Sequence, residues 1–257
     1  MKEKIIAHID TKCPWRDTLY WFEAVDSTNT MAKQWAEDGA LQGTVLIAGT
    51  QTGGRGRMGR SFSSPGGMGI YLSMILRPEC EATELMHLTC AVAVAMCDAV
   101  EGVSGFRPQV KWINDLMAKG KKLGGILTEL SLVPGTASVD FAVVGIGINC
   151  FQAVTDFPDE LQNIAISLQD VIGKPVDRAK LAAAMIESLW KMSRTLLVEK
   201  SAIMTKYTAD CITLGQDIYL LRGEEKHPCR AIDLDLACSD CTTKANAPPV
   251  FLRRFCI

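Results

Sequence analysis

Apolar residues recur along the chain in two patterns, and each pattern predicts a different kind of element. Apolar runs bounded by turn-forming residues are typical of strands. The strands predicted in this way cover residues 21–25, 44–48, 69–76, 110–113, 123–132 and 139–148. Only short turns, at residues 119–122 and 134–135, separate the last three of them. We therefore expect an antiparallel meander in this part of the sheet.

Apolar residues spaced three and four apart predict three helices, at residues 31–38, 82–100 and 178–199. The polar residues 26–30 can cap the first helix, Gly39 can end it, and Gly102 can end the second. Residues 1–20 show little periodicity. Helices combined with a mixed, largely antiparallel sheet make an α+β fold, and we expect the helices on one face of the sheet.

The C-terminal part of the chain predicts a second, smaller domain. A chain of 257 residues can form one large domain and a small one. Residues 215–221 and 230–234 predict short strands, so we divide the chain into a larger domain, 1–205, and a small β-domain, 206–257. From about residue 236 the sequence no longer continues this strand pattern.

Composition and charge narrow the class of protein. The hydrophobic content of 48% supports a sizeable core, and the formal net charge of −2 gives no overall basic field that would attract DNA. We identify no apolar run near the ~20 residues that cross a bilayer, and no signal peptide. We therefore expect a cytoplasmic protein with neither a DNA nor a membrane partner. Five of the ten cysteines, Cys13, Cys80, Cys90, Cys97 and Cys150, are expected to be free thiols in the core, and His87 a core or surface residue.

The stretch 51–60 carries the strongest chemical signal, since four glycines and three arginines are interleaved there between two predicted strands. Glycine lets backbone N–H groups approach a ligand, and guanidinium groups donate paired hydrogen bonds to phosphate or carboxylate. Gly54, Gly56 and Gly59 do not open a helix, and no Walker phosphate-binding motif is present. The stretch therefore predicts an anion-binding loop; a mobile basic loop without a ligand is the alternative.

Polar residues and glycines also stand at the ends of the central strands. Asn114 and Asp115 follow one strand, Lys122 enters the next, and Gly124 and Gly125 lie within it. Glycine inside a strand indicates that something approaches the backbone closely, and Gly145 and Gly147 repeat this feature on the third strand. An ordinary turn, a solvated lysine and β-bulges would explain each feature singly. Their recurrence in one domain favours a ligand site.

Five ordered segments, 26–29, 53–60, 111–115, 122–129 and 145–149, together closely resemble the biotin protein ligases. The resemblance extends over roughly residues 21–200. It implies the fold of that family, a sheet like that of class II aminoacyl-tRNA synthetases and a small C-terminal SH3-like β-barrel, here expected to be incomplete. It also implies an enzyme that makes biotinyl-5′-AMP from biotin and ATP and then transfers biotin to a lysine of a biotin carboxyl carrier domain.

The resemblance also implies roles for particular residues. Lys122 and Arg57 would be the catalytic residues, with Lys122 meeting the biotin carboxylate and the α-phosphate. The biotin head group would lie among Ser27, Thr28, Asn29 and Gln51. Arg55 and Arg57 would order over the ligand, Phe62 would stack on adenine, and Arg60, Asn114, Asp115 and Asn149 would contact the nucleotide or Mg²⁺. The remaining ligand-binding positions would be Gly54, Gly56, Lys111, Gly125 and Gly145.

Several expectations about partners follow from the resemblance. Only about 20 residues precede the first predicted strand, too few for the DNA-binding domain of regulatory members, so we expect the type that only catalyses. Mg²⁺ would accompany ATP, and a homodimer is compatible with the family. A lipoate ligase or octanoyltransferase of the same superfamily is one alternative, and a non-catalytic biotin or nucleotide-binding protein is another. The three arginines argue against the latter, since a neutral ureido ring needs no such charge.

The end of the chain departs from the family. Residues 236–257 resemble no family segment and are compatible with a change of reading frame. His227, Cys229, Cys238 and Cys241 could be written as a zinc site, but their spacing is irregular and a single Cys-x-x-Cys pair is a weak signal. We therefore predict no protein-bound metal.

Overall fold

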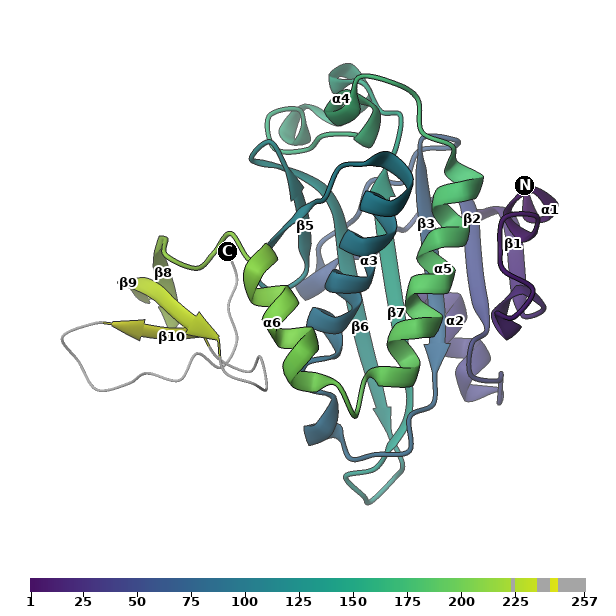
Figure 1. Ribbon diagram of the computed structural model, residues 1–257, viewed down its shortest axis with the longest axis horizontal. Helices are drawn as coiled ribbons and strands as arrows, with labels where there is room; N and C mark the ends of the chain where they lie inside the picture. The colour runs from purple at the N-terminus through teal and green to yellow at the C-terminus, as the bar shows by residue number, and fades with distance from the viewer. Residues whose placement is uncertain (223–224, 235–240, 245–257) are drawn as a thin grey trace.

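A seven-stranded sheet forms the centre of the structure, a computed structural model that describes residues 1–222, 225–234 and 241–244 (Figure 1). Its strand order is β1-β2-β3-β7-β6-β5-β4. The strands are β1 (Leu19–Val25), β2 (Val45–Gln51), β3 (Gly69–Leu76), β4 (Gln109–Lys111), β5 (Asp115–Ala118), β6 (Lys121–Leu132) and β7 (Val139–Asn149). Only β1 and β2 pair in parallel, so the sheet is mixed and largely antiparallel, as predicted.

The predicted meander is present but contains one more strand than expected. Strand β5 pairs with both β4 and β6, so residues 109–149 form four successive antiparallel strands. Strand β5 was not predicted, because its four residues are too few to establish a periodicity. A tight turn at Lys119 and Gly120, both with positive φ, then leads into β6.

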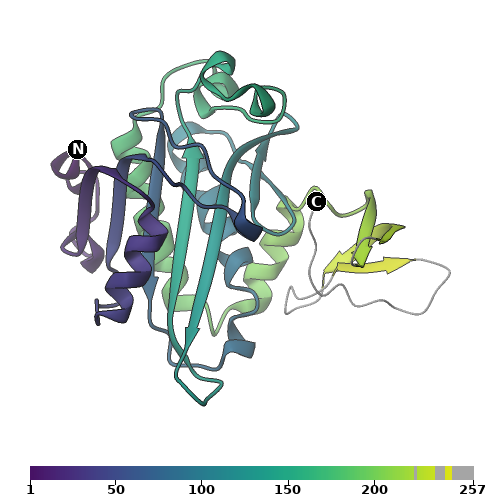
Figure 2. The same ribbon diagram turned by 180° about the vertical axis from the view of Figure 1, so that it is seen from behind.

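Helices cover both faces of this sheet. The long helices α3 (Leu88–Ser104) and α5 (Arg178–Thr195) lie on one face, as predicted, and α6 (Lys200–Asp210), a helix that was not predicted, lies on the same face (Figure 1). The shorter helix α2 (Thr28–Glu37) packs on the opposite face, so the expectation that the helices lie on one face is wrong for α2 (Figure 2). Alternation along the strands explains this arrangement: Leu46 and Ile75 lie under α2, while Val45, Ile47 and Met74 belong to the larger core.

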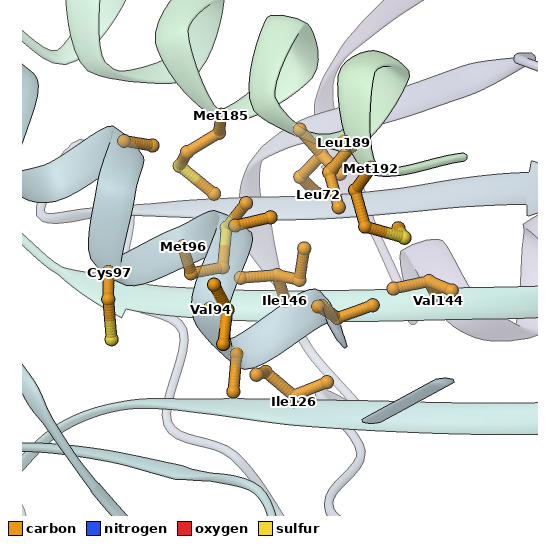
Figure 3. Close-up of a cluster of buried hydrophobic side chains, with 14 of the residues drawn as sticks. Leu72, Val94, Met96, Cys97, Ile126, Val144, Ile146, Met185, Leu189 and Met192 are labelled. Atoms are coloured by element: carbon orange, nitrogen blue, oxygen red, sulfur yellow. The ribbon is translucent and has the colours of Figure 1, made fainter. Parts of the chain in front are cut away.

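The larger core lies between the sheet and helices α3 and α5 (Figure 3). Met96 of α3 and Met185 of α5 face Leu72 and Ile146 of the sheet, and all four side chains are almost completely buried. The predicted core residues join this layer. Cys90 and Cys97 are fully buried, and His87 is buried with its Nε2 atom 2.7 Å from the carbonyl oxygen of Leu196. Burial lowers the pKa of His87 and raises the pKa of the Cys97 thiol to about 12.

Several helix boundaries differ from the prediction. Helix α3 continues through Gly102 and ends at Ser104, where Gly105 caps it with a φ of 75° and donates its N–H to the carbonyl of Glu101. Helix α5 ends at Thr195, and α6 follows it across the proposed boundary between residues 205 and 206. The remaining short helices are α1 (Lys2–Ile6), α4 (Leu168–Ile172) and the 3₁₀ turns Pro14–Arg16, Arg57–Gly59, Ala82–Leu85, Val154–Asp156 and Asp159–Leu161.

One helical stretch has the length and composition of a membrane span. Residues Ala82–Ser104 contain an 18-residue window with a mean hydropathy of 1.4, contrary to our expectation that no such run exists. In the structure, 67% of this window is buried, because α3 packs against the sheet and against its neighbours α5 and α6. A core helix covered on several sides is apolar for the same reason as a membrane span.

A second, three-stranded sheet follows α6. Its strands are β8 (Asp217–Arg222), β9 (Glu225–Leu234) and β10 (Cys241–Lys244), in the order β10-β9-β8. These described strands form an open antiparallel sheet, not a closed barrel. Most of the atypical tail, including Cys238 of the doubtful zinc set, lies outside the described residues. The division into two domains stays a prediction.

Candidate active site

A cavity of about 130 Å³ lies on the face of the sheet that carries α2. The loop after β2 folds back over β6 and β7 and covers it. The predicted residues that line the cavity are Ser27, Thr28, Asn29, Gln51, Arg55, Gly56, Arg57, Arg60, Phe62, Lys111, Asn114, Asp115, Lys122, Gly125 and Gly145. Residues from five distant segments thus meet at one place.

One end of the cavity is polar and uncharged. Ser27 caps α2 by accepting from the N–H of Thr30 at 3.4 Å. The Gln51 Oε1 atom accepts from the backbone N–H and the hydroxyl of Thr28 at 2.8 and 3.0 Å. The hydroxyl of Ser73 on β3 lies 2.8 Å from both Thr28 Oγ1 and Asn29 Oδ1. Because these contacts fix the side chains in place, this end presents preformed donors and acceptors.

Asn29 links this network to the loop. Its Nδ2 atom donates to Glu129 Oε2 at 2.7 Å, and the same carboxylate accepts two hydrogen bonds from Arg55 at 3.1 and 3.3 Å. The side chains of Arg55 and Glu129 are 45% and 26% exposed, so water screens this ion pair substantially. Its main effect is to hold Arg55 in place over the cavity.

The other end of the cavity carries cations. Lys122 Nζ lies 2.7 Å from Asp115 Oδ1, and Arg57 donates to the side-chain oxygen of Asn114 at 3.0 Å. Asn114 in turn donates to the carbonyl of Ile126 at 2.9 Å. Lys122 and Arg57, which are far apart in the chain, are thus bound to neighbouring residues, Arg57 to Asn114 in the turn between β4 and β5 and Lys122 to Asp115 at the start of β5.

Glycines on β7 allow two side chains to lie directly on the sheet. A Cβ atom at Gly145 would collide with the side-chain amide of Asn29, and one at Gly147 would collide with the ring of Phe62. The expectation that glycine marks a close approach is therefore confirmed, although the approaching groups belong to the protein itself. Phe62 also meets Tyr71 edge-on, with ring centroids 6.4 Å apart. Burial raises the pKa of Tyr71, whose hydroxyl donates to the carbonyl of Pro65.

Two predicted residues do not line the cavity. Gly54 lies beside the carbonyl oxygen of Phe62 and the hydroxyl of Ser64, where a Cβ atom would not fit. Asn149 is buried, donates to the carbonyl of Ile166 at 3.3 Å and accepts from Gln152 at 3.2 Å. In this structure both residues shape the surroundings of the cavity.

Ser73 and Glu129 were not predicted as site residues, yet both bind Asn29 and so join the two halves of the network. Ser73 is the only hydroxyl-bearing residue other than Tyr71 in the otherwise apolar strand β3, which is a usable signal for a functional side chain. Glu129 belongs to the segment 122–129 named above, and it lies on the same face of β6 as Gly125 and Leu127 because the three residues are two positions apart. Among the residues that the structure describes, no three histidine, cysteine or acidic side chains are grouped to hold a metal ion.

Comparisons with known proteins agree with this geometry. Residues 21–149 match the biotin/lipoate A/B protein ligase family. The biotin–[acetyl-CoA-carboxylase] ligase of Mycobacterium tuberculosis is 32% identical over 197 residues, which cover 75% of this chain and 70% of that protein. The bifunctional ligase/repressor BirA of Bacillus subtilis is 40% identical over 161 residues, 63% of this chain. This match spans about half, 49%, of the repressor's length.

Solved structures extend the likeness to the fold. A mutant biotin protein ligase from Aquifex aeolicus in complex with biotin superposes with a TM-score of 0.75 at 29% identity, covering 91% of this chain and 94% of that one. The complex of the Aquifex aeolicus ligase with biotin and ATP gives a TM-score of 0.71 at 28% identity, with coverages of 91% and 95%.

The contact between Gly145 and Asn29 can be tested by mutation. Gly145→Ala should lower the free energy of unfolding by about 1–3 kcal/mol, because the methyl group must displace Asn29 from Ser73 and Glu129. Gly102→Ala is the control, since its Cβ would enter open space within α3. That change should be neutral or stabilising by less than about 1 kcal/mol. Denaturant unfolding measures both variants, and equal stabilities would contradict the proposed collision.

Proposed function

This chain belongs to the biotin/lipoate A/B protein ligase family, and on that premise we propose that it is an ATP-dependent biotin protein ligase. It forms biotinyl-5′-AMP from biotin and ATP and then transfers the biotinyl group to a lysine of a carrier domain. The observation that carries this proposal is the division of the cavity into an uncharged polar end at α2 and a cationic end at Lys122 and Arg57. A ureido ring suits the first end, and two reacting anions suit the second.

The first step joins two anions. A carboxylate oxygen of biotin attacks the α-phosphorus of ATP, the bond from that phosphorus to the bridging oxygen breaks, and pyrophosphate leaves. In water, mutual repulsion and hydration oppose this approach. A cation fixed between the two anions offsets both effects, and it stabilises the transition state most because the anions are closest there. Lys122 is in a position to act in this way, and no nucleophilic side chain is required.

The second step releases AMP. The neutral amine of the carrier lysine attacks the carbonyl carbon of the mixed anhydride, an amide bond forms, the bond to the phosphate oxygen breaks, and the amine loses a proton. The name of the Mycobacterium tuberculosis relative identifies acetyl-CoA carboxylase as that ligase's target. We propose a carrier domain of the same chemical class for this chain.

Mg²⁺ fits the oxygen donors at the cationic end. Asp115 and Asn114 both line the cavity, and Mg²⁺ prefers one or two carboxylates together with phosphate oxygens and water. When bound with ATP, the ion would neutralise phosphate charge. Asp115 is the residue that would hold it.

The uncharged polar end favours biotin over lipoate. The hydroxyl groups of Ser27 and Thr28 and the amide of Gln51 can exchange hydrogen bonds with a ureido ring. The dithiolane ring of lipoate has no comparable donors and acceptors, so it would gain no such hydrogen bonds at this end. The cationic end argues against a protein that only binds biotin, because a neutral ring does not need cations around it.

Pyrophosphate exchange into ATP tests the proposed reaction directly. We expect the full chain to catalyse exchange when biotin is present and to be much less active with lipoate, because only biotin satisfies the polar end of the cavity. Exchange with lipoate alone would assign the chain to the other branch of the family. Exchange with neither acid would overturn the enzymatic proposal.

Lys122→Ala should slow adenylate formation by ~10²-fold or more without unfolding the protein, since the lost charge acts mainly in the transition state. Single-turnover formation of biotinyl-AMP is the measurement. Lys121→Ala is the matched control, because Lys121 does not line the cavity and its Nζ atom donates to the carbonyl of Gln162. A rate for Lys122→Ala within a few-fold of the wild type would show that the assigned role is wrong.

Arg57→Gly should release biotinyl-AMP roughly ten to a hundred times faster, because it removes a charge-assisted contact worth about 1.5–3 kcal/mol from the loop that shields a reactive anhydride. The variant should still form the adenylate but label unrelated proteins such as albumin. Met58→Gly is the control. It adds glycine at a position whose φ of 57° already favours it and leaves the guanidinium of Arg57 in place. Unchanged release from Arg57→Gly would mean that another element closes the site.

A further inference from the structure

The turn between β4 and β5 connects the catalytic groups at the cationic end of the cavity. Asn114 binds Arg57 from the loop, Asp115 binds Lys122 from β6, and Lys111 and Trp112 line the cavity beside them. A displacement of this turn by even 1 Å would therefore move several of these groups together. Its position must be fixed by something outside the cavity, since β4 has only three residues and is the last strand of the sheet.

The segment from the end of α6 to Thr213 supplies this support. The Tyr207 hydroxyl donates to the carbonyl of Ile113 at 3.2 Å, and the backbone N–H of Trp112 donates to Thr213 Oγ1 at 2.9 Å. The N–H of Ile212 also donates to the carbonyl of Val110 at 2.9 Å. Two side chains thus bind the backbone of the turn, and a main-chain bond continues the sheet past β4.

The supporting segment is itself held firmly. Tyr207 is completely buried, and Thr213 is 5% exposed. Beside them, Arg107 binds Asp210 through two hydrogen bonds at 2.8 and 2.6 Å and also contacts Asp98 and Glu101 of α3. These contacts join the end of α6 to α3, so the segment from α6 to Thr213 can hold the turn in a fixed position.

We propose that Tyr207 and Thr213 are positioning residues of the active site, which hold the β4–β5 turn where Asn114 meets Arg57 and Asp115 meets Lys122. The inference rests on the proposed function and adds to it two side chains that do not line the cavity. Both residues lie outside the stretch 21–149 that matches the family. They act only through the turn. Removing their hydroxyl groups should therefore affect the cationic end of the cavity and leave the uncharged polar end unchanged.

The test uses variants that delete a hydroxyl group without changing the shape of the side chain. Thr213→Val and Tyr207→Phe should each lower kcat/KM for ATP in adenylate formation by about three- to tenfold, the effect of one hydrogen bond. The dissociation constant for biotin alone should stay within about twofold of the wild type, since Ser27, Thr28 and Gln51 do not touch the supporting segment. Thr213→Ser, which keeps the hydroxyl, should recover most of the lost activity.

Hydrogen exchange measures the contact without relying on catalysis. The amide of Trp112 should exchange at least about threefold faster in Thr213→Val than in the wild type, while amides in the middle of β7 should not change. If wild-type protein forms no adenylate, the proposed function fails, and this exchange measurement still tests the support. If the wild type is active, three results would each overturn the inference: unchanged kcat/KM in both variants, a parallel loss of biotin affinity, or a Thr213→Ser variant as impaired as Thr213→Val.

Discussion

The close contact of two side chains with bare backbone on β7 is the constraint on which the site depends. Because Gly145 has no Cβ atom, Asn29 can lie against the sheet and reach Ser73 and Glu129 together. Because Gly147 also lacks a Cβ atom, the ring of Phe62 packs directly on the same strand. This contact holds the loop after β2 over the cavity. Larger residues at these positions would lift α2 and the loop away from the sheet, and the cavity between them would lose its shape.

The ion pairs around the cavity orient charged side chains for a ligand but contribute little to the stability of the fold. The ion pair of Lys122 with Asp115 is partly open to water, with side chains 37% and 28% exposed, so it adds at most about 1 kcal/mol to folding. Its consequence is that the ammonium group is already oriented before any anion arrives. Preorganised charge of this kind avoids reorganisation during the reaction. Arg55 and Arg57 are likewise held by Glu129 and Asn114.

One face of the sheet packs in the hydrophobic core, and the opposite face carries the cavity. Helices α3 and α5 bury one face in a continuous apolar layer that fixes the strands (Figure 3). On the opposite face, α2 covers only the ends of β2, β3 and β7, and the uncovered part of that face forms the floor of the cavity. The rigid layer behind the strands allows the ligand face to carry glycines and polar groups that would otherwise weaken a sheet.

The sequence by itself determined the local elements and the chemistry. Apolar periodicity predicted six strands of the large sheet and the helices α2, α3 and α5, because burial patterns of a single element repeat over a few residues. The resemblance to the ligase family singled out Lys122, Arg57 and most of the residues that line the cavity, and the arginines of the loop by themselves indicated an anion. Only the tertiary structure decided which distant residues meet. Glu129 lies 100 positions from Asn29, Thr213 lies 101 from Trp112, and α2 was found on the face opposite the other helices. Such pairings depend on strand order and on the packing of whole layers, and no periodicity along the chain records them.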